Sequence, residues 1–147
     1  MNKHFAWLFV LIIALATSPA AQAGFDEGLA AAQRGDYATA LREWHPLAEQ
    51  GFALAQYNLG VMYRDGLSVP EDKVLAYALF NLSAANKPST DNKALSNRDR
   101  LAESLRRSEL LAGQALTREL MQPGNFGKAL DAWLKKPVAR KSSVQNR

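Results

Sequence analysis

Apolar residues recur at helical spacing along most of this chain. From Tyr37 onward, for example, they fall three or four residues apart, which places them on one face of a helix. In this segment they are Tyr37, Ala40, Leu41, Trp44, Leu47 and Ala48. Glycine, proline, aspartate and asparagine gather between such segments, and these residues end helices or form turns. The pattern predicts successive helices over residues 25–34, 37–51, 53–64, 72–85, 93–105 and 108–121. We therefore expect an all-α fold.

The last predicted helix has the clearest apolar face. Its apolar residues follow the spacing i, i+3, i+4, i+7 and i+8. They are Phe126, Ala129, Leu130, Trp133 and Leu134. Asn125 precedes them as a predicted N-cap, and Pro137 ends the helix because proline cannot continue it. We expect this helix to fold back onto the helix at 108–121 and cap the domain. The alternative is that it lies on anionic lipid as an interfacial anchor.

The N-terminus has a different pattern. Lys3 precedes an unbroken apolar run at residues 5–16, and the small-residue sequence Ala21-Gln22-Ala23 follows. A basic residue, an apolar run and an Ala-x-Ala site in this order are typical of a secretory signal peptide. The run is shorter than the roughly 20 apolar residues that a membrane-spanning helix needs. We therefore predict a signal peptide cleaved after Ala23 and a mature protein that is periplasmic or secreted. An uncleaved anchor and a buried helix are the alternatives.

Part of the chain repeats itself. At a constant offset of 36 residues, the corresponding pairs are Asp36 and Asp72, Ala40 and Ala76, Trp44 and Phe80, and Ala48 and Ala84. In the preceding predicted helices, Gly28 corresponds to Gly60. Repeats of this length are typical of stacked helix pairs. In such pairs small residues mark the closest approach of two helices, and a bulky residue fills the gap beside them.

The second unit carries a recognisable motif. Residues 55–66 read AQYNLGVMYRDG, and VPED follows at 69–72. This segment resembles the Sel-one-like repeat (SLR), a branch of the tetratricopeptide superfamily with a longer inter-helix loop. The resemblance implies an exported bacterial protein with a short α-solenoid of antiparallel helix pairs and C-terminal capping helices. The first helix of each pair lines the concave face in such solenoids. The implied partner-binding residues are Leu29, Tyr57, Val61 and Arg64.

The repeat and the helix pattern together predict the organisation of the chain. A signal peptide at 1–23 precedes a tetratricopeptide-like repeat at 24–51 and a Sel-one-like repeat at 52–87. A closing helical pair at 88–122 follows, and the amphipathic helix and a basic tail occupy 123–147.

Composition and charge change this picture only at the C-terminus. The chain is 48% apolar and 22% charged, as ordinary globular proteins are, and its net charge is +4. All 14 acidic residues lie before residue 132, so the end of the chain is purely basic. Its cations include Lys135, Lys136, Arg140 and Lys141. This tail suits an anionic envelope surface. We expect no nucleic-acid partner, because an exported protein rarely meets nucleic acid.

The sequence lacks the residue patterns of common catalytic and cofactor sites. It has no cysteine, which excludes thiol chemistry and disulfides. His45 is the one histidine after residue 23, and without ligand-spaced carboxylates it cannot build a zinc site, so we expect it to be solvated. No serine is followed three residues later by lysine, and no glycine-rich phosphate loop is present. We therefore expect a non-enzyme without cofactor or metal, and no residues support a hydrolase.

These observations favour a non-catalytic protein–protein interaction module or adaptor of the bacterial periplasm. Its concave face would bind a protein or peptide segment, and an apolar strip with one cationic donor, Arg64, suits a segment bearing a carboxylate. The alternative is an envelope-associated accessory protein that contacts peptidoglycan or anionic lipid through its basic tail.

Overall fold

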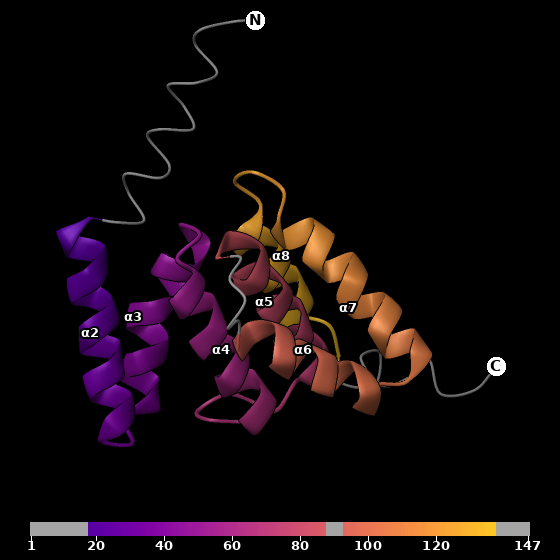
Figure 1. The fold of residues 1–147 in the computed structure, drawn as a ribbon, viewed down its shortest axis with the longest axis horizontal. Coiled ribbons are helices and arrows are strands. Elements are labelled where there is room, and N and C mark those ends of the chain that lie inside the picture. Colours follow the sequence, from indigo (N-terminus) through magenta and orange to yellow (C-terminus); the bar gives the residue numbers. More distant parts are fainter. Residues whose placement is uncertain (1–17, 88–92, 138–147) are drawn as a thin grey trace, which may run out of the picture.

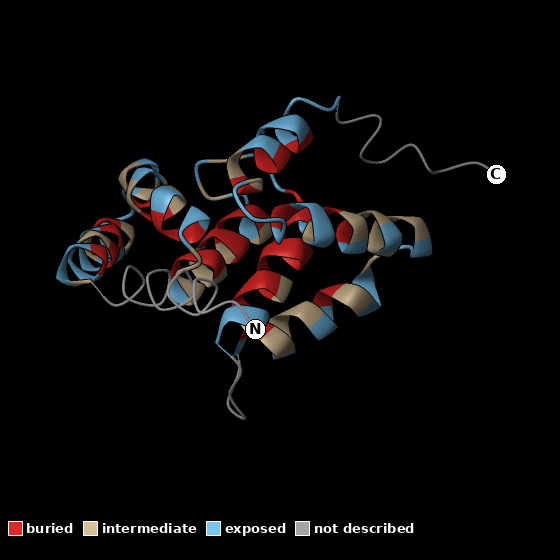
Figure 2. Ribbon diagram, turned by 90° about the horizontal axis from the view of Figure 1, so that it is seen from above, coloured by how far each residue is buried: buried red, intermediate tan, exposed pale blue. Residues whose placement is uncertain are grey.

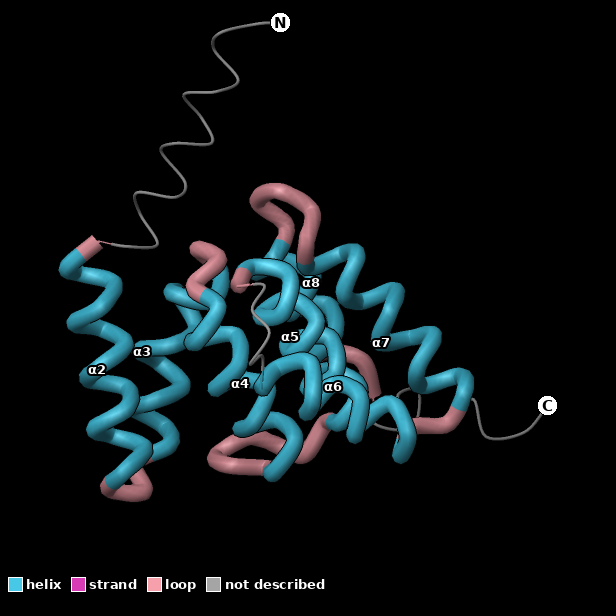
Figure 3. Tube along the Cα trace, viewed as in Figure 1, coloured by secondary structure: helices cyan, strands magenta, loops and turns pink. Residues whose placement is uncertain are grey.

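The computed structural model describes residues 18–87 and 93–137. In these ranges the chain forms helices and no strands, which confirms the predicted all-α fold (Figures 1 and 3). The helices are α2 (Pro19–Gln33), α3 (Tyr37–Glu49), α4 (Ala53–Asp65), α5 (Lys73–Asn86), α6 (Lys93–Ser104), α7 (Arg107–Leu120) and α8 (Phe126–Leu134). None of these described helices has the length and apolar character needed to cross a membrane. The apolar run at 5–16, residues 88–92 of the predicted loop at 87–92, and the tail residues Arg140 and Lys141 lie outside the described residues.

The first described helix begins earlier than predicted. α2 starts at Pro19 and continues without a break through Ala23, whereas the pattern predicts a start at residue 25. Ser18 provides the N-cap, because its hydroxyl oxygen accepts a hydrogen bond from the backbone N–H of Ala21 at 3.1 Å. Pro19 suits the start of a helix because its fixed φ angle is already helical. The expected cleavage site therefore lies inside a helix, and Ala21 is buried.

Asp36 and Asp72, which correspond in the sequence repeat, cap the helices that follow them in the same way. Asp36 before α3 and Asp72 before α5 each accept a hydrogen bond from the backbone N–H three residues later, at 3.1 and 2.9 Å. Each carboxylate thereby satisfies a backbone donor that has no partner within its helix. Asn125 occupies the predicted N-cap position of α8, but its side chain makes no capping hydrogen bond there. Asn125 instead donates to the carbonyl oxygen of Glu119 at 2.9 Å and ties α8 to the end of α7.

In the α2–α3 and α4–α5 pairs, a glycine of the first helix lies against an aromatic ring of the second. A Cβ atom on Gly28 would overlap the indole of Trp44, and one on Gly60 would lie 2.7 Å from Cε1 of Phe80. A side chain at either glycine would have to push the ring away, so glycine allows the helices to pack this closely. The glycine and aromatic residues that correspond in the sequence therefore share a structural role.

α5 lies at the centre of the helical assembly. α4, α6 and α7 all pack against it, and Figure 2 shows buried residues concentrated in this middle region. A helix surrounded by neighbours needs apolar residues around its whole circumference, which explains the run VLAYALF at 74–80. α6 packs mainly against α5, and α7 packs against both α5 and α8.

α8 folds back against α7, as the sequence pattern predicts (Figure 1). Its apolar face is buried at Phe126, Ala129, Leu130 and Trp133. Leu134 belongs to the same predicted face but is 41% exposed, because it is the last residue of the helix and lies at the edge of the packed surface.

Candidate binding groove

Several predicted partner-binding residues lie together on α4. Tyr57, Val61 and Arg64 share one face of the helix, and all are half-buried. Asn97 of α6 joins two of them, because it accepts a hydrogen bond from Nη1 of Arg64 at 2.6 Å and donates one to the hydroxyl of Tyr57 at 3.3 Å. Leu29 lies on a different helix, α2, and is 40% exposed. α6 therefore covers part of the surface on which the sequence places a groove.

Arg64 is also paired with its neighbour in the chain. Its Nε and Nη2 atoms donate to the two carboxylate oxygens of Asp65, both at 2.6 Å. This two-pronged hydrogen bonding raises the pKa of Arg64 and lowers the pKa of Asp65. A partner carboxylate at this position would have to compete with Asp65 for the guanidinium.

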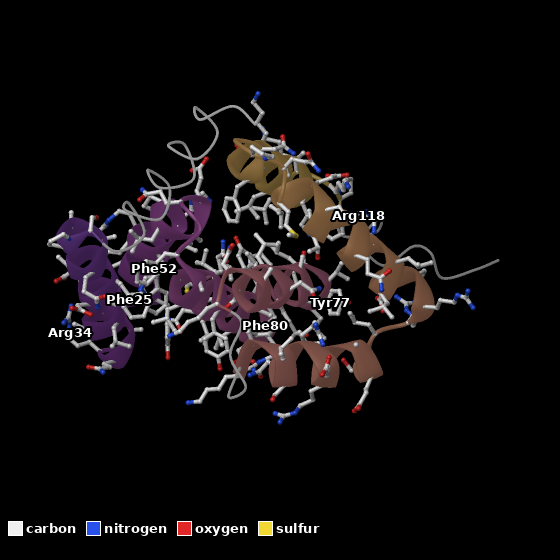
Figure 4. The ribbon with its side chains drawn as sticks, turned by 45° about the horizontal axis from the view of Figure 1, so that its top comes forward. Phe25, Arg34, Phe52, Tyr77, Phe80 and Arg118 are labelled. Atoms are coloured by element: carbon white, nitrogen blue, oxygen red, sulfur yellow. The ribbon has the colours of Figure 1, made fainter. Side chains whose placement is uncertain are left out.

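α3, α5 and α7 form a second surface, and α8 lies across it. In Figure 4, α7 and α8 lie on one side of α5, and α6 lies on the other. The ring centroid of Phe126 on α8 lies 6.0 Å from that of His45 on α3, in an edge-on arrangement. A Cβ atom on Gly127 would lie 3.0 Å from Oε1 of Glu49, so the end of a side chain from α3 reaches the backbone of α8. His45 is half-buried and packs against an aromatic ring, so it is only partly solvated. We call the surface formed by α3, α5 and α7 the α8 groove.

Asp72 links α8 to the start of α5. Its Oδ1 accepts the capping hydrogen bond from Leu75, and its Oδ2 accepts a hydrogen bond from the indole N–H of Trp133 at 2.9 Å. Asp72 and Trp133 are both buried. The backbone N–H of Asp72 also donates to the carbonyl oxygen of Tyr63 at 2.7 Å. Burial, together with the charge of Asp72, raises the pKa of the Tyr63 phenol. Asp72 therefore joins three helices: its carboxylate links the start of α5 to α8, and its backbone N–H links to α4.

A cleft opens at the C-terminal end of α8, and we call it the loop cleft. Its volume is about 760 Å³, within the range of roughly 300–1,000 Å³ that is typical of ligand sites. Most of its wall is apolar. It is lined by Leu41, Tyr63, Val69, Pro70, Glu71, Asp72, Lys73, Val74, Ser104, Leu105, Glu109, Leu134 and Lys136.

Several charged groups at the loop cleft are paired within the protein. Glu71 and Lys73 form an ion pair at 3.6 Å, and Arg106 holds Glu109 at 2.6 Å. The hydrogen bond from Arg106 is the main reason that the pKa of Glu109 is lowered. Nζ of Lys136 lies 4.7 Å from the centre of the indole ring on α8, a cation–π contact. These pairs leave apolar contact as the main attraction that the cleft offers.

A smaller cleft lies at the other end of α8, next to the turn between α7 and α8, and we call it the turn cleft. Its volume is about 400 Å³, and Phe126 forms part of its wall. Gln56 lines it as a buried side chain whose Nε2 donates to the carbonyl oxygen of Ala48 and whose Oε1 accepts from Asn86, both at 2.9 Å. The two clefts therefore lie at opposite ends of the helix that fills the α8 groove.

Sequence reasoning missed both clefts and the link between Asp72 and Trp133. The sequence does contain a signal for the loop cleft. Leu134 extends the apolar face of α8 past its last full turn, and Val69 puts an apolar residue into a polar loop. Which distant segments these residues meet is not encoded in local spacing, so the cleft becomes visible only in three dimensions.

The described residues offer binding surfaces and no arrangement for metal chemistry. Within residues 18–87 and 93–137, no group of three or more histidine, cysteine, aspartate or glutamate side chains is placed to hold a metal ion. Comparison with known proteins gives no match to this chain, whether among protein-family models, curated proteins or solved structures.

Proposed function

We propose that this protein is a non-catalytic interaction module that binds a segment of a partner protein. We further propose that its helices form a short solenoid of the Sel-one-like type. The shared glycine–aromatic contacts of the α2–α3 and α4–α5 pairs support stacking of equivalent units. So does the packing of each helix from α2 to α5 on the next one in the chain.

The loop cleft is the observation that carries this proposal. It is large, open and mainly apolar, and several parts of the chain meet there: α3, the end of α4, the α4–α5 loop, the start of α5, the α6–α7 junction and the end of α8. A surface of this kind is typical of sites that take up apolar side chains of a partner. Tyr57, Val61 and Arg64 lie on α4 beneath part of α6 and are the less open surface.

The chemistry of the cleft indicates the kind of segment that it binds. Apolar side chains such as Leu105 and Leu134 call for apolar anchors on the partner. The rim carries both signs of charge, at Glu71, Lys73 and Lys136. Burial of apolar surface depends little on salt, so moderate salt should weaken binding only slightly. We place this activity in the bacterial periplasm because of the N-terminal sequence pattern.

Site-specific photo-cross-linking tests the proposal. A photoreactive phenylalanine analogue replaces Leu134 in the full chain, which is then exposed to light in cells of the native host. Because Leu134 is 41% exposed at the edge of the loop cleft, we expect a discrete cross-linked protein. Mass spectrometry of the adduct identifies the partner.

The same analogue at Leu111 provides a matched control. Leu111 is also an exposed leucine, at 56%, but it lies on α7 outside the residues that line either cleft. Equal adducts from both positions, or none from Leu134, would contradict binding in the loop cleft. Cross-links from Leu134 to lipid alone would favour the envelope-surface alternative.

A further inference from the structure

We infer that the α8 groove is a receptor site for an amphipathic helix of a partner protein, and that α8 is its exchangeable internal occupant. The inference rests on the proposed function, because it names the class of partner and the element that controls access to it.

The groove is longer than the helix that fills it. The turn cleft is lined by residues near the C-terminal ends of α3, α5 and α7, and the loop cleft by residues nearer the N-terminal ends of the same helices. For the turn cleft these are Ala48, Leu82 and Leu120, and for the loop cleft Leu41, Val74 and Glu109. α8 contributes Phe126 to one cleft and Leu134 to the other. α8 therefore fills the middle of the groove and leaves both ends open.

The way α8 is held indicates what the groove recognises. Phe126, Leu130 and Trp133 are buried against it at the spacing i, i+4 and i+7, which is how amphipathic helices anchor in grooves. Asp72 adds a directional contact, because it accepts the indole N–H of Trp133 at 2.9 Å. The groove therefore selects an aromatic residue, an aliphatic residue and a tryptophan on one helix face.

α8 is short enough to be displaced. It has 9 residues, and an isolated helix below roughly 12–15 residues is marginal in water, so α8 needs the groove to stay helical. A tethered helix competes at an effective concentration on the order of millimolar. A partner helix must therefore make contacts that α8 lacks. A helix with the same three anchors and a further turn at each end would gain them in the two clefts.

Peptide exchange into the full chain tests this inference. The probe is a fluorescent synthetic peptide that carries residues 126–134 with one further leucine-containing helical turn at each end, so that it can make the cleft contacts that α8 lacks. Its binding is measured by fluorescence anisotropy. Trp133→Phe in the chain keeps the aromatic ring but removes the hydrogen bond to Asp72, which weakens the internal occupant. We expect this variant to bind the peptide about fivefold more tightly than the unmodified chain does. The same substitution in the peptide should weaken its binding by a similar factor. Circular dichroism confirms that each variant is folded.

A reversible lock supplies the control. The chain contains no cysteine, so Glu49→Cys with Gly127→Cys introduces one cysteine pair, at a position where the end of the Glu49 side chain on α3 reaches α8. Cysteine is shorter than glutamate, so a short, cleavable bis-thiol cross-linker closes the pair in place of a direct disulfide. The cross-linked chain should bind no peptide, and cleavage of the linker should restore binding. Peptide binding by the cross-linked chain, or none by the folded Trp133→Phe variant, would overturn the inference. Dimers formed without peptide would also overturn it, because they would make α8 of a second copy the occupant. A partner that still cross-links from Leu134 in the locked chain would support the proposed function, because the loop cleft would then bind it while α8 stays in place. The same result would overturn the inference that the partner displaces α8.

Discussion

At the scale of single residues, contacts between glycine and aromatic rings determine how closely the helices approach. The contact that the sequence repeat indicates in two helix pairs occurs again outside the repeat. A Cβ atom on Gly113 of α7 would lie 2.7 Å from Cδ1 of Tyr77 on α5. α5 therefore receives a glycine from α4 against Phe80 and one from α7 against Tyr77. Glycine–aromatic contacts therefore set the distance of α5 from both α4 and α7.

Alanine substitution at Gly60 measures this effect. Gly60→Ala should destabilise the protein by about 1–3 kcal/mol, because the ring of Phe80 must move to make room. Gly24→Ala is the matched control within α2, where the new Cβ would lie 3.7 Å from Cδ1 of Leu47, an ordinary contact distance. This change should be neutral or stabilise by up to about 1 kcal/mol, since alanine favours helices more than glycine does. Urea unfolding gives both values, and equal midpoints would contradict the close packing at Gly60.

Asp36 gives the start of α3 a dependence on pH. Hydrogen bonds from the side chain and the backbone of Thr39 lower the pKa of its carboxyl. A pKa lowered by folding means that the charged carboxylate stabilises the protein above its ordinary pKa. This stabilisation is lost as the pH falls through the lowered value. Asparagine caps helices about as well and does not titrate. Asp36→Asn should therefore flatten the fall in thermal midpoint between about pH 5 and pH 2, and parallel profiles for the two proteins would argue against this role.

At the scale of elements, sequence spacing predicts the helices well and their partners poorly. The predicted starts and ends from α3 to α8 fall close to the observed ones, because turn residues and caps are local signals. α2 is the exception. Ala21-Gln22-Ala23 has the pattern of a cleavage site, and its alanines also favour a helix once Ser18 and Pro19 start one.

The candidate site was less predictable for a physical reason. Periodicity shows which face of a helix is apolar but not which distant helix covers it. Tyr57 and Arg64 were predicted on an open face, and Asn97 of α6 reaches both of them. Trp133 was predicted as part of an apolar face, while its hydrogen bond to Asp72 joins residues far apart in the sequence. Such contacts depend on how α6 and α8 pack, which local patterns do not contain.

Two leucines of α8 test whether burial, and not apolar character alone, determines how much a residue contributes to stability. Leu130 is fully buried, whereas Leu134 on the next turn is 41% exposed. Leu130→Ala should cost about 2–5 kcal/mol in unfolding free energy, because it leaves a cavity beneath α8. Leu134→Ala should change stability by less than about 1 kcal/mol. Chemical denaturation followed by circular dichroism compares the two, and similar losses would show that α8 is not seated as described.

At the scale of the whole molecule, α8 joins early and late parts of the described chain. It contacts α3 through Phe126 and α5 through Trp133, while it packs along α7. The first and last regions of the described chain therefore share one core. We expect them to unfold in a single transition.

The beginning of α2 leads to a prediction about maturation. Cleavage after Ala23 would remove the Ser18 cap and the buried Ala21 and place a positively charged amine at the new helix start. The lost cap and the unfavourable charge together should cost about 1–2 kcal/mol. Thermal unfolding of a chain that begins at Ser18 and one that begins at Gly24 measures the difference. Equal stabilities would mean that the first turns of α2 contribute nothing.

If the predicted leader is removed after Ala23, the same feature sets an order of events during biosynthesis. A protease needs its substrate extended in the active site, and residues 19–23 are helical in the folded protein. Cleavage would then have to happen before α2 folds, so processing and folding would compete in time. A precursor that folded first would keep its leader, and slow folding of α2 would favour cleavage.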